Sequence, residues 1–213
     1  MARRDAAGNA EADDALDQRA APRISLMLRA AKLICGRAEF LCILRDISVT
    51  GIKARLFHPL PPGSDYAIEL GNGERLAVEP VWERDGHAGF RFVTGTAPIH
   101  ALLDEPSEFP KRQIRLRIDL PVSLLARGVV HPATMLDLSQ HGAKLECAVP
   151  LALRQPVQIE APGLPPLAGR IRWRRGTVHG VVFHTGFRLD ELACLAGRLG
   201  LCPRPELRPA VNH

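Results

Sequence analysis

The sequence predicts an all-β protein made of two similar small domains, each a barrel or a sandwich. Residues 44–57 and 135–148 follow one pattern at an offset of 91 positions, and 14 of the 47 residues from 46 to 92 are identical to their counterparts. Ordinary composition would give roughly three identities by chance. A unit of this length is the size of a small domain, and short apolar runs between glycine- and proline-rich turns are typical of β-strands.

The strands are predicted in the order in which the chain presents them. In the first copy, two apolar runs flank a tight polar turn, and three more follow between turn residues. These runs are FLCILRDI (40–47), IKARLF (52–57), YAIEL (66–70), RLAVEPVW (75–82) and AGFRFV (88–93). The second copy has counterparts in PVQIE (156–160), AGRIRW (168–173) and HGVVF (179–183). Trp82 and its repeat Trp173 alternate with charged neighbours, so we expect both in the core.

A short helix is predicted after each copy. Apolar residues from Leu189 to Leu199 recur at helical spacing, acidic residues stand in the first turn, and Gly200 follows the last turn. A weaker counterpart covers residues 97–104. We therefore expect a flexible N-terminus, a first domain, a linker, a second domain and a flexible tail, with the bounds 1–17, 18–104, 105–110, 111–200 and 201–213.

Composition limits the class of protein. With 46% hydrophobic and 24% charged residues the chain has globular proportions, and its uncharged stretches fall short of the ~18 residues that a membrane-spanning helix needs. The five cysteines form no CxxC pair, and no apolar segment of a secretory signal follows the N-terminal arginines. We therefore expect reduced thiols, a cytoplasmic location and no membrane span.

Charge is concentrated in the second half of the chain. Residues 1–105 carry a net charge of −2, and residues 106–213 carry +7. The basic half favours an acidic partner such as a nucleic acid, an anionic lipid surface, a nucleotide or an acidic protein, although an arginine-rich composition alone would also produce it. With 5% aromatic residues the chain lacks the stacking side chains of single-strand binders, so no specific nucleic acid is expected. No nucleophile–base pair or Cys/His cluster is present, so we expect neither catalysis nor a metal site.

The repeated motif D-x-S-x-x-G offers the chemistry of a binding site. Alone, Asp46, Ser48 and Gly51 would form a tight turn, in which Asp and Ser bond the backbone and Gly supplies a positive φ. Upstream, Arg19 and Arg23 stand four residues apart in a segment expected to be extended, so both would project from one face. Arginine pairs with phosphate and stacks on bases, and a carboxylate accepts from the N1 and N2 donors of guanine. The set therefore suits a guanine nucleotide that carries phosphates.

R-x-x-x-R followed by D-x-S-x-x-G on a β-hairpin resembles the PilZ domain, and the strands that end in Trp82 and Phe92 resemble its closing strands. The resemblance covers residues 18–95 and 111–190. It implies two tandem six-stranded β-barrels, each followed by a short helix, that bind cyclic di-GMP, a bacterial second messenger, on the outer surface. The resemblance implies that the ligand of the first barrel is bound by Arg19, Arg23, Asp46, Ser48 and Gly51. It implies no cofactor besides this ligand.

The second copy departs from this pattern. Alignment of RISL (23–26) with RIDL (117–120) places Arg117 at the second arginine and Gln113 at the first. Arg112 and Arg115 flank Gln113, and the spacing leaves open which of the two would substitute for it. Glutamine carries no charge and is a weaker partner for phosphate. We therefore expect binding mainly in the first barrel and a weak second site made of Arg112, Arg117, Asp137, Ser139 and Gly142.

The predicted function is that of a cytoplasmic receptor that relays the level of cyclic di-GMP to an unidentified protein effector, in motility or exopolysaccharide regulation. The alternative is a PilZ-like adaptor that binds no nucleotide and acts through protein–protein contacts. A homo-oligomer is a further hypothesis, because Glu79 and Glu83 stand where the repeat has Arg170 and Arg174. These oppositely charged strands would pair between barrels or between molecules, whereas two solvated strand faces are the simpler interpretation.

Overall fold

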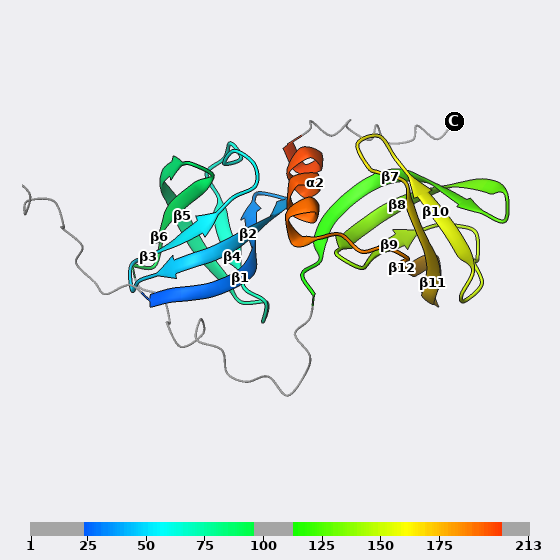
Figure 1. Ribbon diagram of the computed structural model, residues 1–213, viewed down its shortest axis with the longest axis horizontal. Coiled ribbons are helices and arrows are strands. Elements are labelled where there is room, and N and C mark those ends of the chain that lie inside the picture. Colours follow the sequence, from blue (N-terminus) through cyan, green and yellow to red (C-terminus); the bar gives the residue numbers. More distant parts are fainter. Residues whose placement is uncertain (1–23, 96–112, 202–213) are drawn as a thin grey trace, which may run out of the picture.

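The computed structural model describes residues 24–95 and 113–201, which form two closed antiparallel β-barrels with a helix between them (Figure 1). Six strands close each barrel, as the resemblance to the PilZ domain implies. In the first barrel, hydrogen-bonded neighbours follow the order β1-β2-β3-β6-β5-β4. The strands are β1 (Ile24–Cys35), β2 (Ala38–Ile47), β3 (Gly51–Arg55), β4 (Tyr66–Glu69), β5 (Arg75–Arg84) and β6 (His87–Phe92).

The second barrel repeats this topology as β7-β8-β9-β12-β11-β10. In both barrels the ladder register shifts in the first strand, near the end of the second and in the fifth. The two copies therefore share the positions of their β-bulges as well as their sequence pattern. The strands are β7 (Leu116–Ala126), β8 (Val129–Ser139), β9 (Gly142–Glu146), β10 (Pro156–Glu160), β11 (Leu167–Arg175) and β12 (Val178–Phe183).

Alternating side chains fill the interior of each barrel. In β4, for example, Tyr66 and Ile68 are buried, whereas Ala67 and Glu69 between and beyond them are partly exposed. This period of two is what a strand with one solvated face requires. The largest fully buried side chains include Leu33, Phe40 and Ile68 in the first barrel and Leu124, Met135 and Leu145 in the second.

One helix, α2 (Leu189–Leu201), lies between the two barrels (Figure 1). At its start, the Arg188 N–H donates to the Glu191 carboxylate over 2.8 Å, which caps the first turn. The helix contacts β2 of the first barrel as well as β7 of the second. The core of the second domain therefore extends onto Leu41, a fully buried residue on the outer side of the first barrel. The helix residues buried in this cluster are Leu192, Ala193, Leu195 and Ala196.

The helix predicted to close the second copy is thus confirmed, and its position between the barrels is new information. The other predicted helix, over residues 97–104, lies outside the described residues. So do the predicted linker at 105–110, the N-terminal segment 1–17 and all but the first residue of the predicted tail.

The barrels do not meet through the oppositely charged strands. Their contact runs through α2, β2 and β7, and the Arg117 backbone N–H donates across it to Glu39 Oε2 over 2.9 Å. Glu79 instead pairs with Arg91 of its own barrel at 2.6 Å, and Glu83 accepts from a backbone N–H of that barrel. Pairing of these strands within one chain is therefore wrong, because burial of an apolar helix face stabilises more than exposed ion pairs do. Pairing between molecules stays a prediction.

Candidate functional site

The D-x-S-x-x-G motif forms the turn between β2 and β3 in the first barrel. The Ser48 N–H donates to the Gly51 carbonyl over 2.8 Å, and the Ser48 hydroxyl accepts from the Gly51 N–H over 3.2 Å. The same hydroxyl lies 3.4 Å from the Thr50 hydroxyl. In the second barrel, the Ser139 hydroxyl donates to the Gly142 carbonyl over 2.9 Å. Each motif serine therefore closes its own turn, as the turn interpretation predicts.

The motif glycines are required for a reason that the sequence did not suggest. Neither Gly51 nor Gly142 has a positive φ. A Cβ at Gly51 would overlap the carbonyl oxygen of Phe90 on β6, and a Cβ at Gly142 would overlap that of Val181 on β12. The predicted positive φ is therefore wrong, and the close approach of two strands in the barrel wall explains each glycine.

A β-bulge turns the motif aspartate to the outside of each barrel. The register shifts between Leu44 and Asp46 in β2, and between Met135 and Asp137 in β8. Leu44 and Met135 are fully buried, whereas the Asp46 and Asp137 side chains keep 29% and 13% of their area exposed. Bulges beside binding sites commonly redirect a side chain in this way.

A row of four cross-strand partners continues from the aspartate across the outer wall of the first barrel. Asp46 lies opposite Lys53, Lys53 opposite Gly89, and Gly89 opposite Trp82. Three strand steps separate the ends of this first outer row, a span of about 14 Å. Lys53 Nζ lies 3.9 Å from Asp46 Oδ2. The second barrel has an equivalent second outer row, made of Asp137, Lys144, Gly180 and Trp173.

Both tryptophans lie on the outer wall, so their predicted place in the core is wrong. A bulge in β5 and another in β11 reverse the alternation of side chains immediately before each tryptophan. A Cβ at Gly89 or Gly180 would overlap the indole of Trp82 or Trp173, so each ring covers a glycine of the neighbouring strand. Trp173 is 39% exposed, and the Arg84 guanidinium lies 5.3 Å from the ring centroid of Trp82.

The aspartate of the second outer row is held by two cations. Arg115 Nη1 donates to Asp137 Oδ1 over 2.9 Å, and Lys144 Nζ lies 3.2 Å from Asp137 Oδ2. Charge-assisted hydrogen bonds of this kind are stronger than neutral ones. Arg115 was left outside the predicted second site, and it is the residue that the structure joins to the motif.

Strand register changes the alignment of the arginine motif in the second copy. Ile24 lies opposite Ile47, and Leu116 lies opposite Leu138, which stands 91 positions after Ile47. Leu116 is therefore the structural counterpart of Ile24. Arg115, directly before Leu116, is in turn the counterpart of the second linker arginine.

The alignment that placed Arg117 at that position is therefore wrong. The ladder skips residues 26–28 in β1 but only residues 118–119 in β7, so the offset between the copies changes within this strand. With the corrected offset, Lys111 stands at the position of Arg19. The second copy thus reads K-x-x-x-R, with a cation at both positions.

The structure brings together part of each predicted site. In the first barrel the motif residues Asp46, Ser48 and Gly51 surround one turn, and Asp137, Ser139 and Gly142 do so in the second. Three linker residues lie outside the described residues: Arg19, Arg23 and Arg112. The outer-row residues were missed as site residues, although the repeat itself had marked Lys53, Trp82 and Gly89.

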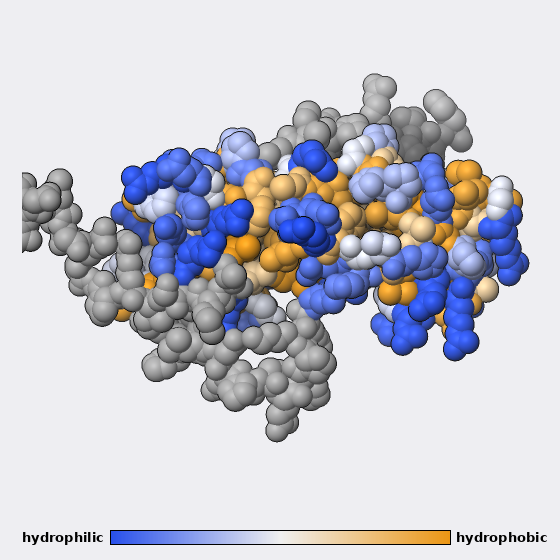
Figure 2. Space-filling model, viewed as in Figure 1, coloured by the Kyte–Doolittle hydropathy of each residue, from blue (hydrophilic) through white to orange (hydrophobic). Residues whose placement is uncertain are grey.

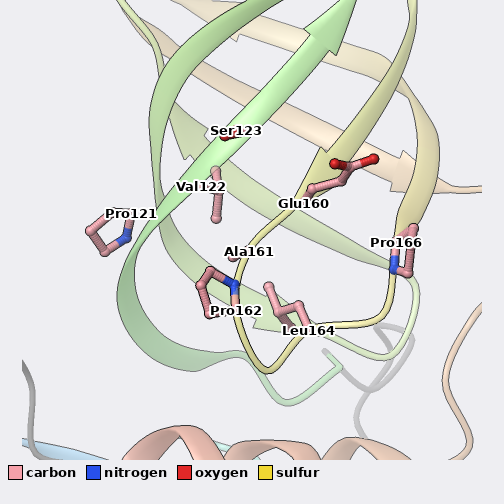
Figure 3. A pocket seen from close by; sticks show the side chains of 8 residues that line it. All are labelled: Pro121, Val122, Ser123, Glu160, Ala161, Pro162, Leu164 and Pro166. Atoms are coloured by element: carbon pink, nitrogen blue, oxygen red, sulfur yellow. The ribbon is translucent and has the colours of Figure 1, made fainter.

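A cavity of about 550 Å³ beside β7 and β10 is a weaker candidate site (Figure 3). Its lining contains three prolines and Glu160 but no basic residue, which disfavours an anionic ligand. Within residues 24–95 and 113–201, no three His, Cys, Asp or Glu residues gather as metal ligands. In the same described part of the chain, no helix is long and apolar enough to cross a membrane.

Comparison with known proteins gives one family match over both barrels. The PilZ domain matches residues 17–105 and 110–197. Similar solved structures include Borreliella burgdorferi PlzA in complex with c-di-GMP, at 12% identity and a TM-score of 0.32, covering 84% of this chain and 91% of that one. Another is the Bacillus subtilis inhibitor of motility, MotI/DgrA, at 11% identity and 0.33, covering 81% and 97%. A third is Escherichia coli YcgR in complex with c-di-GMP, at 11% and 0.26, covering 74% and 76%. No curated protein matches the chain.

Proposed function

Because the chain belongs to the PilZ domain family, we propose that it is a receptor for cyclic di-GMP and that the ligand lies along the first outer row. The observation that supports this most directly is the duplicated row itself. A tight turn alone does not require an aspartate that a bulge directs outward. Nor does it require a tryptophan three strands from that aspartate, packed over a glycine of the neighbouring strand. Both barrels nevertheless keep the same four residue types in the same register.

The first outer row has the polar groups that a guanine nucleotide needs. The Asp46 carboxylate accepts hydrogen bonds from the N1 and N2 donors of guanine, which adenine does not present in this pattern. Lys53 supplies a cation for phosphate, and Ser48 an adaptable hydroxyl at the edge of the turn. The indole of Trp82 and the Arg84 guanidinium beside it offer planar groups for a base.

The linker arginines complete the proposed site. Ile24, the first described residue of β1, lies opposite Ile47, and Ser25 lies opposite Asp46. The segment with Arg19 and Arg23 therefore leads directly into the strand that borders the motif. Arginine binds phosphate bidentately and stacks on bases, so both residues would hold the ligand from the linker side. The proposed domain bounds remain 18–104 and 111–200.

The second barrel is proposed to bind the nucleotide more weakly. Its cations are Lys111 and Arg115, and lysine binds phosphate as a point charge without the bidentate geometry of arginine. Asp137 is engaged by Arg115 and Lys144, so a ligand that uses this carboxylate has to compete with these ion pairs. The proposed reason for weaker binding is the lysine at the first linker position, and not the uncharged Gln113.

The receptor would act on a protein effector, in motility or exopolysaccharide regulation. One observation favours the alternative of an adaptor that binds no nucleotide: Ser48 and Gly51 are accounted for by the turn and by the contact with Phe90. The two functions differ in whether Asp46 contributes to binding of cyclic di-GMP.

Calorimetric titration with cyclic di-GMP, with GTP as the comparison ligand, separates these functions. We expect the wild type to bind cyclic di-GMP, and Asp46→Ala or Arg23→Ala to lower the affinity about tenfold to a hundredfold, the cost of a lost charge-assisted bond. Asp65→Ala is the matched control, since Asp65 is an exposed carboxylate of the same barrel outside the row. Equal affinities of Asp46→Ala and Asp65→Ala would exclude the proposed row, and a wild type that binds no cyclic di-GMP would favour the adaptor.

A further inference from the structure

One end of the second barrel combines exposed apolar residues with arginines. Neighbouring strands are antiparallel throughout the barrel, so β7, β9 and β11 all finish at the same end. The connections that follow them, from β7 to β8, β9 to β10 and β11 to β12, lie on the side of the barrel away from α2 (Figure 1). We call this surface the distal end.

The distal end carries the exposed large apolar residues of the second barrel. Their exposed fractions run from 38% to 64%. Hydrophilic and hydrophobic surfaces alternate over this part of the molecule (Figure 2). The apolar residues are Val129, Val130, Val149, Leu153 and Trp173. The arginines among them, all exposed, are Arg127, Arg154, Arg174 and Arg175.

Two hydrogen bonds hold the β9–β10 connection against β11. The Arg154 N–H donates to the Ile171 carbonyl over 2.8 Å, which fixes the β9–β10 connection beside β11. Arg174 Nη1 lies 3.4 Å from the Leu151 carbonyl of that connection. Leu153 at 64% exposure therefore projects next to an arginine-rich strand. Glu146 is the acidic residue of this end, which leaves a net positive surface.

The corresponding end of the first barrel has a different character. There, α2 covers the fully buried Leu41, Phe57 packs against the same cluster, and Gly197 of the helix lies against His58. The repeat places Pro132 at the position of Leu41 and Ala148 at that of Phe57. The distal end thus lacks the two large apolar residues on which a helix docks, and presents apolar turn tips with arginines instead.

We infer that the distal end of the second barrel docks on an anionic lipid surface. Apolar tips such as Leu153 and Val130 enter the headgroup region, while the arginines bind lipid phosphates. An indole such as that of Trp173 suits this interface, because it is apolar with one polar N–H. A nucleic acid is less suitable, because one aromatic side chain gives no series of stacking platforms. The inference does not depend on nucleotide binding.

Co-sedimentation with vesicles tests this docking. The full chain should sediment with vesicles of phosphatidylcholine and phosphatidylglycerol and remain in solution with phosphatidylcholine alone. Arg154→Glu with Arg175→Glu should lower the partition coefficient about tenfold or more, since each basic residue near an anionic surface contributes about 1 kcal/mol. The matched control is Arg37→Glu with Arg198→Glu, two exposed residues outside the distal end, and should bind as the wild type does.

The apolar contribution is tested separately. Val130→Ser with Leu153→Ser should also weaken sedimentation with anionic vesicles. The variant Trp82→Phe retains Trp173 as its one tryptophan, and the fluorescence emission of Trp173 should shift to the blue when this variant binds vesicles. Equal sedimentation of the distal-end charge variant and its control would overturn the inference. So would a wild type that ignores anionic vesicles but binds a single-stranded oligonucleotide through these arginines.

Discussion

Arg115 donates to Asp137 over 2.9 Å, and this ion pair joins the segment that enters β7 to the motif of the second barrel. Arg115 directly precedes β7, and Asp137 lies at the bulge near the end of β8. A ligand that uses the Asp137 carboxylate must therefore displace or share Arg115. The pair is consistent with the corrected alignment, because it joins the motif aspartate to Arg115, at the position of the second linker arginine.

That alignment predicts which linker substitution strengthens the second site. In an Asp46→Ala background, where the first site is weakened, Lys111→Arg should raise the affinity for cyclic di-GMP several-fold because it restores bidentate phosphate binding. Gln113→Arg and Arg117→Ala should leave the affinity unchanged. Titration calorimetry measures all three. A gain from Gln113→Arg with none from Lys111→Arg would restore the original alignment.

The motif glycines should tolerate no side chain. Gly51→Ala or Gly142→Ala places a Cβ against a carbonyl oxygen of the facing strand, and overpacking of this kind costs about 1–3 kcal/mol. Thermal unfolding should show a lower Tm, by about 2–4 °C per kcal/mol for a chain of this length. Gly71→Ala is the control, because a Cβ there meets nothing within 4 Å and the φ is not positive. Equal Tm values for Gly51→Ala and Gly71→Ala would contradict this explanation.

The contact between α2 and the first barrel should be sensitive to small changes. Leu41→Ala removes a fully buried side chain from it, at a cost of about 2–5 kcal/mol. Gly197→Val brings a Cβ to 3.0 Å from the His58 Cβ and should force the helix away. Hydrogen exchange of the α2 amides should increase in both variants. Val81→Ala, at a residue 64% exposed, should change nothing, and unaltered exchange in Leu41→Ala would show that the helix does not depend on this contact.

Acid should destabilise the same contact through His58. Burial lowers the pKa of His58, although the Pro59 carbonyl and Glu83 partly oppose this. Its Nδ1 lies 2.7 Å from the Pro59 carbonyl, and its buried Nε2 has no hydrogen-bond partner among the residues that the structure describes. Below the ordinary pKa of 6.5 the unfolded chain binds a proton that the folded chain resists, so the free energy of unfolding falls as the pH drops.

Chemical denaturation at a series of pH values from 7 to about 5 measures this loss. His179 contributes in the same direction, since burial also lowers its pKa. His58→Gln should therefore reduce the pH dependence without abolishing it. A pH profile identical to that of the wild type would exclude His58 as a cause.

The fold could be predicted because the repeat and the strand pattern agree. Strands such as 66–69 alternate without interruption, so their buried residues follow from the sequence. The outer rows could not be found in this way. A period of two, continued through the bulge in β5, puts Trp82 inside. Pro80 is a local signal of that bulge, because proline within a sheet occurs at edges and bulges, but the second copy has Ile171 at this position and lacks the signal. The signal common to both copies was the recurrence of Gly89 and Gly180, each of which faces a tryptophan.

The arginine alignment failed for a related reason. Residues 23–26 and 117–120 are alike in sequence, whereas the ladder skips three residues in one strand and two in the other. Sequence similarity between the two strands cannot reveal that their bulges contain different numbers of residues. The position of α2 could not be predicted either, because an apolar helix face indicates that the helix is buried but not which surface it packs against.

The position of α2 has a consequence for biosynthesis. The last strand of the first barrel ends at residue 92, and the helix that covers Leu41 ends at residue 201, which is 109 residues later. At translation rates of about 5–20 residues per second, the first barrel leaves the ribosome roughly 5–20 s before its cover exists. During that interval Leu41 and Phe57 are exposed to solvent or to a chaperone. If translation stopped within the second domain, the first barrel would be released with the apolar surface around Leu41 and Phe57 uncovered. Such a surface favours aggregation.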